Sequence, residues 1–287
     1  MFKMNKTKNV ISGAYIFIVM LLLYAPILVL VIFSFNESGN LGHFSGFSLK
    51  WYLELFKDAT AFTALKNTLI LAVESSALAT VIGTFAALGI YRMQNKLVKS
   101  LVTTVTNVPM MNPDIVTGVS MMLFFVAVAG IFKFPNALGQ GTMLIAHTTF
   151  NLPYVILSVL PRFKQMDKSL TEAALDLGCT PSKAFFKVEL PFIVPGIVSG
   201  AMLGFTLSLD DFVISHFVSS PDFQTLPLYI YNQTAHNVKF SMYALCSIII
   251  AVILLLMLAI NFIGSRSDAK RTFGKNVKTE KRNLAKH

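Results

Sequence analysis

Four carboxylic acid side chains lie inside stretches of this sequence that are otherwise almost entirely apolar. They are Glu74, Asp114 and the adjacent pair Asp210 and Asp211. An ionisable residue in a membrane span is costly to bury, so each is a candidate for lining a transport pathway or for pairing with another polar group. No Lys or Arg lies deep in the same stretches. Acids without buried cations favour a pathway for a cation over one for an anion.

Each of these acids also has a purely structural interpretation. Asp210 and Asp211 would, in that interpretation, cap a break in a helix near the membrane surface, and Glu74 would form a hydrogen bond to a Ser or Thr. Asp114 follows Asn112-Pro113, and proline interrupts helical hydrogen bonding. The structural alternative for Asp114 is therefore an unwound turn whose free backbone groups need partners.

Glycines give the Asp210-Asp211 pair a predicted direction. Gly196, Gly200 and Gly204 recur every four residues, a small-xxx-small pattern that lets another helix approach closely. If one helix continues through the pair, 3.6 residues per turn bring Asp211 to nearly the same face as these glycines. Asp210 then points elsewhere. Both would lie about 30 Å along the helix from its cytoplasmic start, near the outer mouth.

Other reactive residue types lack the companions that catalysis or metal binding needs. His147 and His216 are isolated, so packing is a better interpretation than ligation, and Cys179 and Cys246 lie in different predicted environments. Neither a disulfide nor a metal site is expected. The chain contains no G-x-x-x-x-G-K-[ST] sequence with which to bind ATP phosphates. We predict that it is not an enzyme and holds no cofactor, and that its energy source is another chain or an ion gradient.

The acids must be positioned by membrane helices. The chain has 287 residues, of which 54% are hydrophobic and 13% charged, where soluble domains have about 25% charged residues. A span needs about 20 predominantly apolar residues. Six runs meet this requirement, at residues 12–35, 63–90, 101–130, 141–160, 191–219 and 241–264. These runs predict an all-α integral membrane protein with six transmembrane helices.

Positive charge sets the predicted orientation. Most of the 24 Lys and Arg residues lie at the N-terminus, in the second-to-third and fourth-to-fifth connections, and in the tail after the last run. Short cytoplasmic segments carry the positive excess, so both termini and these two connections are expected to be cytoplasmic. The net charge of +10 then faces anionic lipid, which explains it better than nucleic acid does.

The most polar interior stretch, from Thr171 to Pro191, lies in the cytoplasmic fourth-to-fifth connection. Ser169 and Glu172 have the spacing of a capping box, so a helix is expected to begin there. Gly178 is placed to end it in a left-handed conformation. Thr180-Pro181 has the residues preferred at the N-cap and first position of a second helix.

Both predicted loop helices carry apolar residues on one face. The first has Leu170, Ala173, Ala174 and Leu177 at helical spacing, and the second has Ala184, Phe185 and Val188. Such a face either rests on the bilayer and the protein's own helices or docks a partner. Periodicity alone does not decide between these two interpretations.

The sequence motif of this loop favours docking to a partner. E-A-A-L-D-L-G, followed after nine residues by V-E-L-P, resembles the EAA loop of type I, binding-protein-dependent ABC importer permeases, with Val188 where Ile is usual. The resemblance implies that residues 161–190 couple to a separate cytoplasmic ATPase. The matching coupling residues are Glu172, Ala173, Ala174, Asp176, Gly178, Phe185, Leu190 and Pro191.

Further segments resemble the same family. They are F-S-L-K-W-Y-L-E-L-F before the second run, K-N-T-L-I-L-A within it, and V-P-M-M-N-P-D-I-V-T-G in the third. G-F-T-L-S-L-D-D-F-V-I-S in the fifth run is similar to the PotC-type membrane subunits of spermidine/putrescine importers. The resemblance implies the type I permease fold and one half of a polyamine pathway in a bacterial cell membrane.

Partners and domains are expectations from that resemblance. It implies ATPase subunits that bind the ATP, a second permease subunit that is a paralogue of this chain, and an extracytoplasmic substrate-binding protein. The expected division is an N-terminal anchor span and outer segment at 1–61, a permease core at 62–264, and a basic cytoplasmic tail at 265–287. Permeases for other small solutes and secondary transporters remain alternatives. An intramembrane aspartyl protease is disfavoured because L-D-D-F matches neither of its Y-D and G-x-G-D motifs.

Overall fold

The computed structural model describes residues 6–40, 42–134, 137–236, 239–252 and 254–255. Apart from two isolated bridges, the regular structure in these ranges is helical, which confirms the predicted all-α class. The elements are α1 Lys6–Phe33, α2 Lys50–Leu55, α3 Ala59–Arg92, α4 Lys96–Met111, α5 Asp114–Phe132, α6 Gln140–Gln165, α7 Lys168–Asp176, α8 Pro181–Ala184, the π-helical turn η1 Phe185–Glu189, α9 Leu190–Asp210, α10 Val213–Val218 and α11 Leu226–His236. A last apolar helix covers Phe240–Val252.

Within the described residues, 5 helical segments are long and apolar enough to cross a membrane. They are Ser12–Phe33, Ala59–Arg92, Asp114–Phe132, Gln140–Gln165 and Pro181–Asp210. The predicted sixth span, 241–264, is described only in its first half, as part of Phe240–Val252. The six-span count therefore stays a prediction, and the predicted basic tail at 265–287 lies outside the described residues.

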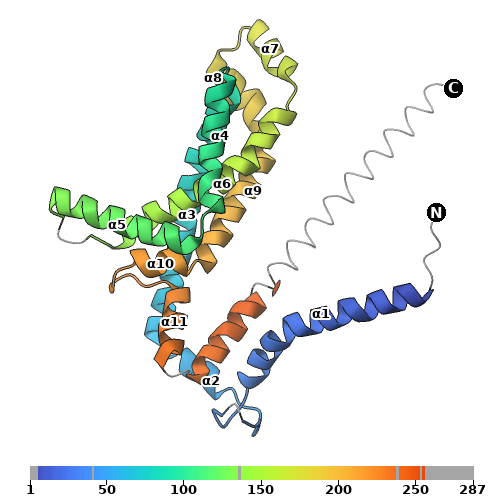
Figure 1. Ribbon diagram of the computed structural model, residues 1–287, viewed down its shortest axis with the longest axis vertical. Helices are drawn as coiled ribbons and strands as arrows, with labels where there is room; N and C mark the ends of the chain where they lie inside the picture. Colours follow the sequence, from blue (N-terminus) through green and yellow to red (C-terminus); the bar gives the residue numbers. More distant parts are fainter. Residues whose placement is uncertain (1–5, 41, 135–136, 237–238, 253, 256–287) are drawn as a thin grey trace. The chain divides into compact units, whose positions relative to one another are not determined.

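The predicted third span, 101–130, is wrong as a single helix. Helix α4 ends at Met111, and α5 begins at Asp114 after two residues with extended backbone, Asn112 at ψ 138° and Pro113 at ψ 135°. Proline lacks a donor N–H and drives the preceding residue out of the helical region. The predicted turn at Asn112-Pro113 is thus confirmed, and α5 leaves α4 in a different direction (Figure 1).

The predicted fifth span, 191–219, is wrong at both ends. Upstream, α8, η1 and α9 follow one another without a break, so the helix begins at Pro181 rather than Pro191. Downstream, α9 stops at Asp210 because Asp211 has an extended backbone, with φ −64° and ψ 121°. The chain then forms the short, separate helix α10.

Contacts divide the chain into two compact units. The first unit is Ala59–Asn232, and the second combines Met1–Asp58 with Gln233–His287. In the second unit, hydroxyl groups join α1, α2 and the last described helix: the Tyr52 hydroxyl lies 2.8 Å from Ser34 Oγ and 3.2 Å from Ser247 Oγ. The division into functional domains at 1–61, 62–264 and 265–287 stays a prediction.

The centre of the unit Ala59–Asn232 is a three-helix core of α3, α6 and α9 (Figure 1). Glycines allow the close packing. A Cβ at Gly196 would lie 2.8 Å from the Ser158 carbonyl oxygen, and one at Gly200 would lie 3.2 Å from Val155 Cα, both on α6. Gly204 is likewise buried against α6. The glycine face predicted from the sequence is therefore confirmed as a helix interface.

Candidate coupling loop and pathway residues

The first loop helix, α7, begins at Lys168 and is capped by Asp167, whose carboxylate accepts a hydrogen bond of 3.0 Å from the backbone N–H of Ser169. The predicted capping box of Ser169 and Glu172 is wrong, because an acceptor two residues upstream already holds the first turn. Hydrogen bonds from the backbone and side chain of Ser169 lower the pKa of Asp167. Glu172 is left exposed on the second turn of the helix.

The glycine corner is confirmed. Gly178 has φ +82°, and its N–H donates to the Leu175 carbonyl at 2.9 Å while the Cys179 N–H donates to the Ala174 carbonyl at 3.1 Å. These bonds satisfy the carbonyls at the end of α7. The predicted second start is confirmed as well, since Thr180 Oγ1 accepts from the Lys183 N–H at 3.4 Å and Pro181 occupies the first turn.

The loop is anchored on one side and apolar on the other. Phe185, in η1, is 6% exposed and belongs to the core cluster that α3, α6 and α9 form. On α7, by contrast, Leu170 is 49% exposed and Leu175 41%, and Leu177, directly after the helix, is 86% exposed. Phe185 thus holds the loop to the helical core. Members of the predicted coupling set that are exposed to a partner in this loop are Glu172, Ala173, Asp176 and Gly178. Leu190 is half-buried and Pro191 is exposed at the start of α9.

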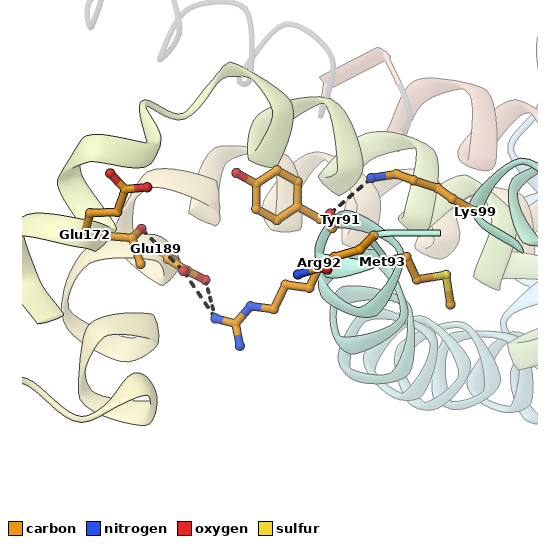
Figure 2. A pocket seen from close by; sticks show the side chains of 8 residues that line it. Tyr91, Arg92, Met93, Lys99, Glu172 and Glu189 are labelled. Carbon is orange, nitrogen blue, oxygen red and sulfur yellow. Dashed lines mark hydrogen bonds and ion pairs between the residues drawn. The ribbon is translucent and has the colours of Figure 1, made fainter. Parts of the chain in front are cut away.

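A pocket of about 510 Å³ lies between the loop and the end of α3. Figure 2 shows the side chain of Arg92, the last residue of α3, directed at the carboxylate of Glu189. Arg92 Nη2 lies 3.2 Å from Oε1 and 3.1 Å from Oε2 of Glu189. Thr171 and Glu172 of α7 line the same pocket.

The side chain of Asp211 is only 8% exposed and lies in a polar network at the α9–α10 break. Its carboxylate accepts hydrogen bonds from the backbone N–H groups of Ile214, at 3.3 Å, and Ser215, at 2.8 Å. It also lies 3.5 Å from Nε2 of His147. The structural alternative, a cap on a helix break, is what the geometry shows. The argument that placed Asp211 on the glycine face is wrong, because α9 has ended before Asp211.

His147 is the centre of this network, a role that sequence reasoning missed. Its Nδ1 contacts Ser208 Oγ, which in turn lies 2.8 Å from Ser75 Oγ, and its Nε2 lies 3.2 Å from Ser215 Oγ. The network therefore joins α3, α6, α9 and α10. The only signal in the sequence was a scatter of polar residues within three apolar runs, and nothing in their spacing pairs them.

The other predicted pathway acids are exposed on the isolated chain. Glu74 lies near the middle of α3, Asp114 in the first turn of α5, and Asp210 in the last turn of α9. No described residue forms a hydrogen bond or ion pair with Glu74, so the predicted Ser or Thr partner is not seen in that part of the chain. The structure does not gather the four acids into one cluster, and their role in a pathway stays a prediction.

Comparison with known proteins decides the family. Residues 79–267 match the family described as the binding-protein-dependent transport system inner membrane component. The chain belongs to this family. The permease is accordingly a multi-pass transporter component of the bacterial inner membrane, as the sequence predicted, and the EAA-loop resemblance is confirmed.

Two relatives from Escherichia coli K12 match most of the permease. It is 37% identical over 249 residues to the putrescine transport system permease protein PotI, covering 87% of this chain and 89% of that one. It is 35% identical over 266 residues to the spermidine/putrescine transport system permease protein PotC, covering 93% and 98%. Both similarities extend well beyond the EAA loop, through most of the described helices.

Solved structures show that the fold is shared. A chain of a bacterial ABC transporter for import of the acidic polysaccharide alginate matches with a TM-score of 0.68 at 14% identity, over 90% of this chain and 96% of that one. A chain of the inward-facing MetNI methionine ABC transporter matches with a TM-score of 0.56 at 20% identity, over 71% and 92%. The permease therefore has the fold of the membrane chains of ABC importers.

Proposed function

We propose that this chain is a permease subunit of an ATP-driven importer for polyamines, forms half of the translocation pathway, and couples to a separate ATPase through residues 161–190. The names of its relatives, which are putrescine and spermidine/putrescine transport system permeases, support the substrate class. The fold shared with ABC transporter chains supports the mechanism class.

The observation that carries the coupling role is the way α7 is presented. Leu170 and Leu175 on α7, and Leu177 directly after it, are exposed, and the helix is fixed by a cap at one end and a left-handed glycine at the other. A mobile loop would not hold these side chains in one register. A short amphipathic helix with exposed apolar side chains, in a loop anchored to the core through Phe185 of η1, suits insertion into a groove on a partner.

Glu74 supports a cationic substrate. It lies about 22 Å along α3 from Ala59 and about 27 Å from Arg92, so it is far from both ends of the span. A carboxylate exposed at that depth is unfavourable against lipid. Its exposed face in the isolated chain is better suited to a water-filled pathway or to the second permease subunit. A carboxylate there would attract a protonated amine.

The assembly that we propose contains more than this chain. ATP would be bound by the ATPase subunits, a paralogous permease would supply the other half of the pathway, and an extracytoplasmic protein would deliver substrate. We also propose six spans with both termini cytoplasmic, where the basic segments face anionic lipid. The solved complex of the alginate transporter with a periplasmic protein supports a partner of that kind.

Reconstitution tests this proposal. The chain would be co-purified with its native partners, identified by mass spectrometry, placed in proteoliposomes and supplied with labelled spermidine or putrescine. We expect uptake that requires ATP inside the proteoliposomes and that persists when ion gradients across their membrane are collapsed. Uptake that needs a gradient instead of ATP would identify a secondary transporter. ATP-driven uptake of some other solute, with no polyamine competition, would retain the permease and reject its substrate.

A further inference from the structure

Three segments that are distant in the sequence meet at the carboxylate of Glu189. Arg92 comes from the end of α3, Thr171 from α7, and Glu189 itself from η1, immediately before α9. Arg92 Nη2 lies within 3.2 Å of both carboxylate oxygens, and Thr171 Oγ1 donates to Oε1 at 3.4 Å. The Glu189 side chain is 3% exposed, whereas that of Arg92 is 47% exposed.

Burial makes this contact specific. A carboxylate removed from water is unfavourable unless it is paired and hydrogen-bonded. Among the described residues, Arg92 is the only basic group in an ion pair with Glu189. The neighbouring Lys99 is directed elsewhere, since its Nζ donates to the Tyr91 carbonyl at 3.1 Å. Glu189 therefore depends on Arg92 for its charge partner.

The π-helical turn brings Glu189 to this position. In η1 the N–H of Leu190 donates to the carbonyl of Phe185, a bond one residue longer than in an α-helix. An extra residue in a turn rotates the next part of the helix by about 100° relative to an uninterrupted α-helix. Phe185 and Glu189 are both buried in this turn, so one end of η1 fixes the loop by packing and the other fixes it by charge.

We infer that the Arg92–Glu189 pair, with Thr171, is the polar link through which movement of the coupling loop is passed to α3. Arg92 and Glu189 are thus positioning residues for energy coupling. This inference rests on the proposed function, because it assumes that an ATPase moves α7. Helix α7 packs on α8 and η1 and has no comparably extensive contact with α3. An open pocket separates the loop from the end of α3, and the ion pair bridges its two sides.

The consequence reaches the membrane interior. Helix α3 carries Glu74 and packs along α6 and α9, so a pull on Arg92 acts on the helix that bears the deepest exposed acid. Without the link, α7 retains its cap, its glycine corner and its apolar face, and still docks its partner. ATP hydrolysis then continues while less substrate is moved in each cycle.

The test is the ratio of ATP hydrolysed to substrate imported, measured for the full assembled complex in proteoliposomes. Arg92→Gln and Glu189→Gln remove one charge each, and Glu189→Gln nearly preserves shape as well. We expect each to raise the ratio about fivefold or more, the lower end of a typical coupling between sites. Arg92→Lys should stay within about twofold of wild type, because a single nitrogen of Arg92 contacts Glu189 and an ammonium can replace it. Lys99→Gln, on the same pocket but not on Glu189, is the matched control.

Each outcome has one meaning. A wild-type ratio in Arg92→Gln overturns the link. So does a loss of assembled complex that leaves the ratio unchanged in the complex that remains, since the pair would then serve folding alone. A raised ratio that Arg92→Lys fails to restore also overturns the charge argument. If the wild-type complex itself hydrolyses ATP without importing spermidine or putrescine, the proposed function fails instead, and the wild-type measurement shows this before any variant is compared.

Discussion

Gly178→Val is expected to uncouple the permease without removing it from the membrane. Gly178 has φ +82°, a backbone conformation that disfavours L-residues by about 1–2 kcal/mol and β-branched residues further. A Cβ at this position would have no heavy atom within 4 Å. The effect therefore comes from the backbone conformation alone, not from a collision within this chain.

The magnitude follows from that backbone preference. If the corner must be left-handed for α7 to dock, a penalty of about 1–2 kcal/mol lowers the affinity for the ATPase about 5-fold to 30-fold. Gly178→Asn is the matched control, because Asn tolerates the left-handed region far better than Val does. Gly178→Ala should fall between the two.

The assay pairs ATPase binding with polyamine uptake, both normalised to permease present in the membrane. We expect the order Gly, Asn, Ala, Val from strongest to weakest binding. Wild-type uptake with Gly178→Val would refute the reasoning, and so would an Asn variant that fails as badly as the Val variant. Disappearance of the Val variant from the membrane would show that the corner is needed for folding rather than for docking.

Four further predictions concern the loop cap and the acids. Asp167→Ala should weaken ATPase binding by less than about tenfold through loss of the α7 cap, and Asp167→Asn should not, as a pull-down from native membranes would show. Hydrogen bonds lower the pKa of Asp167, so its stabilisation of α7 should be fully present at neutral pH and be lost only as the pH falls through that lowered pKa. Loss of hydrogen-exchange protection in α7 at a pH only slightly below neutral would contradict this. Glu172→Ala should leave α7 folded in the same exchange experiment, since Asp167 and not Glu172 holds its start; an unfolded α7 would reject that assignment. Asp211→Asn should impair labelled spermidine uptake more than Asp210→Asn, because Asn can still cap α10 but removes the charge that faces His147. Glu74→Gln should also reduce uptake, and wild-type rates in all three variants would show that none of these charges acts in transport.

Local chemistry predicted the loop well. Gly178 and Thr180-Pro181 act through residues next to them in sequence, so a short motif contains the whole cause, and the structure has both features. The predicted cap of α7 was wrong, because the sequence offers two suitable capping residues. Asp167 and Ser169 are both residues that can cap a helix, and the spacing of Ser169 to Glu172 favoured Ser169. In the structure the cap is Asp167, the earlier of the two in the chain.

Contacts between distant residues were beyond such reasoning. The Asp211 prediction assumed that one helix continued through L-D-D-F, whereas the backbone becomes extended at Asp211 and its carboxylate caps the next helix. His147 joins Ser208 and Ser215, and Arg92 joins Glu189 across 97 residues. No periodicity within one run carries information about a partner in another run, so these pairs required the fold.

Val155 on α6 sets how the three central helices can move. Its Cγ1 methyl lies 2.7 Å from where a Cβ of Gly83 on α3 would be, and 3.3 Å from where a Cβ of Gly200 on α9 would be. One methyl group of Val155 thus fills the space left by two glycines, Gly83 on α3 and Gly200 on α9. If α3 or α9 slid along α6, the Val155 methyl group would collide with the backbone of the sliding helix. A close-packed interior accommodates such a displacement only by a discrete rearrangement. Any relative motion of α3, α6 and α9 therefore requires repacking around this one methyl group.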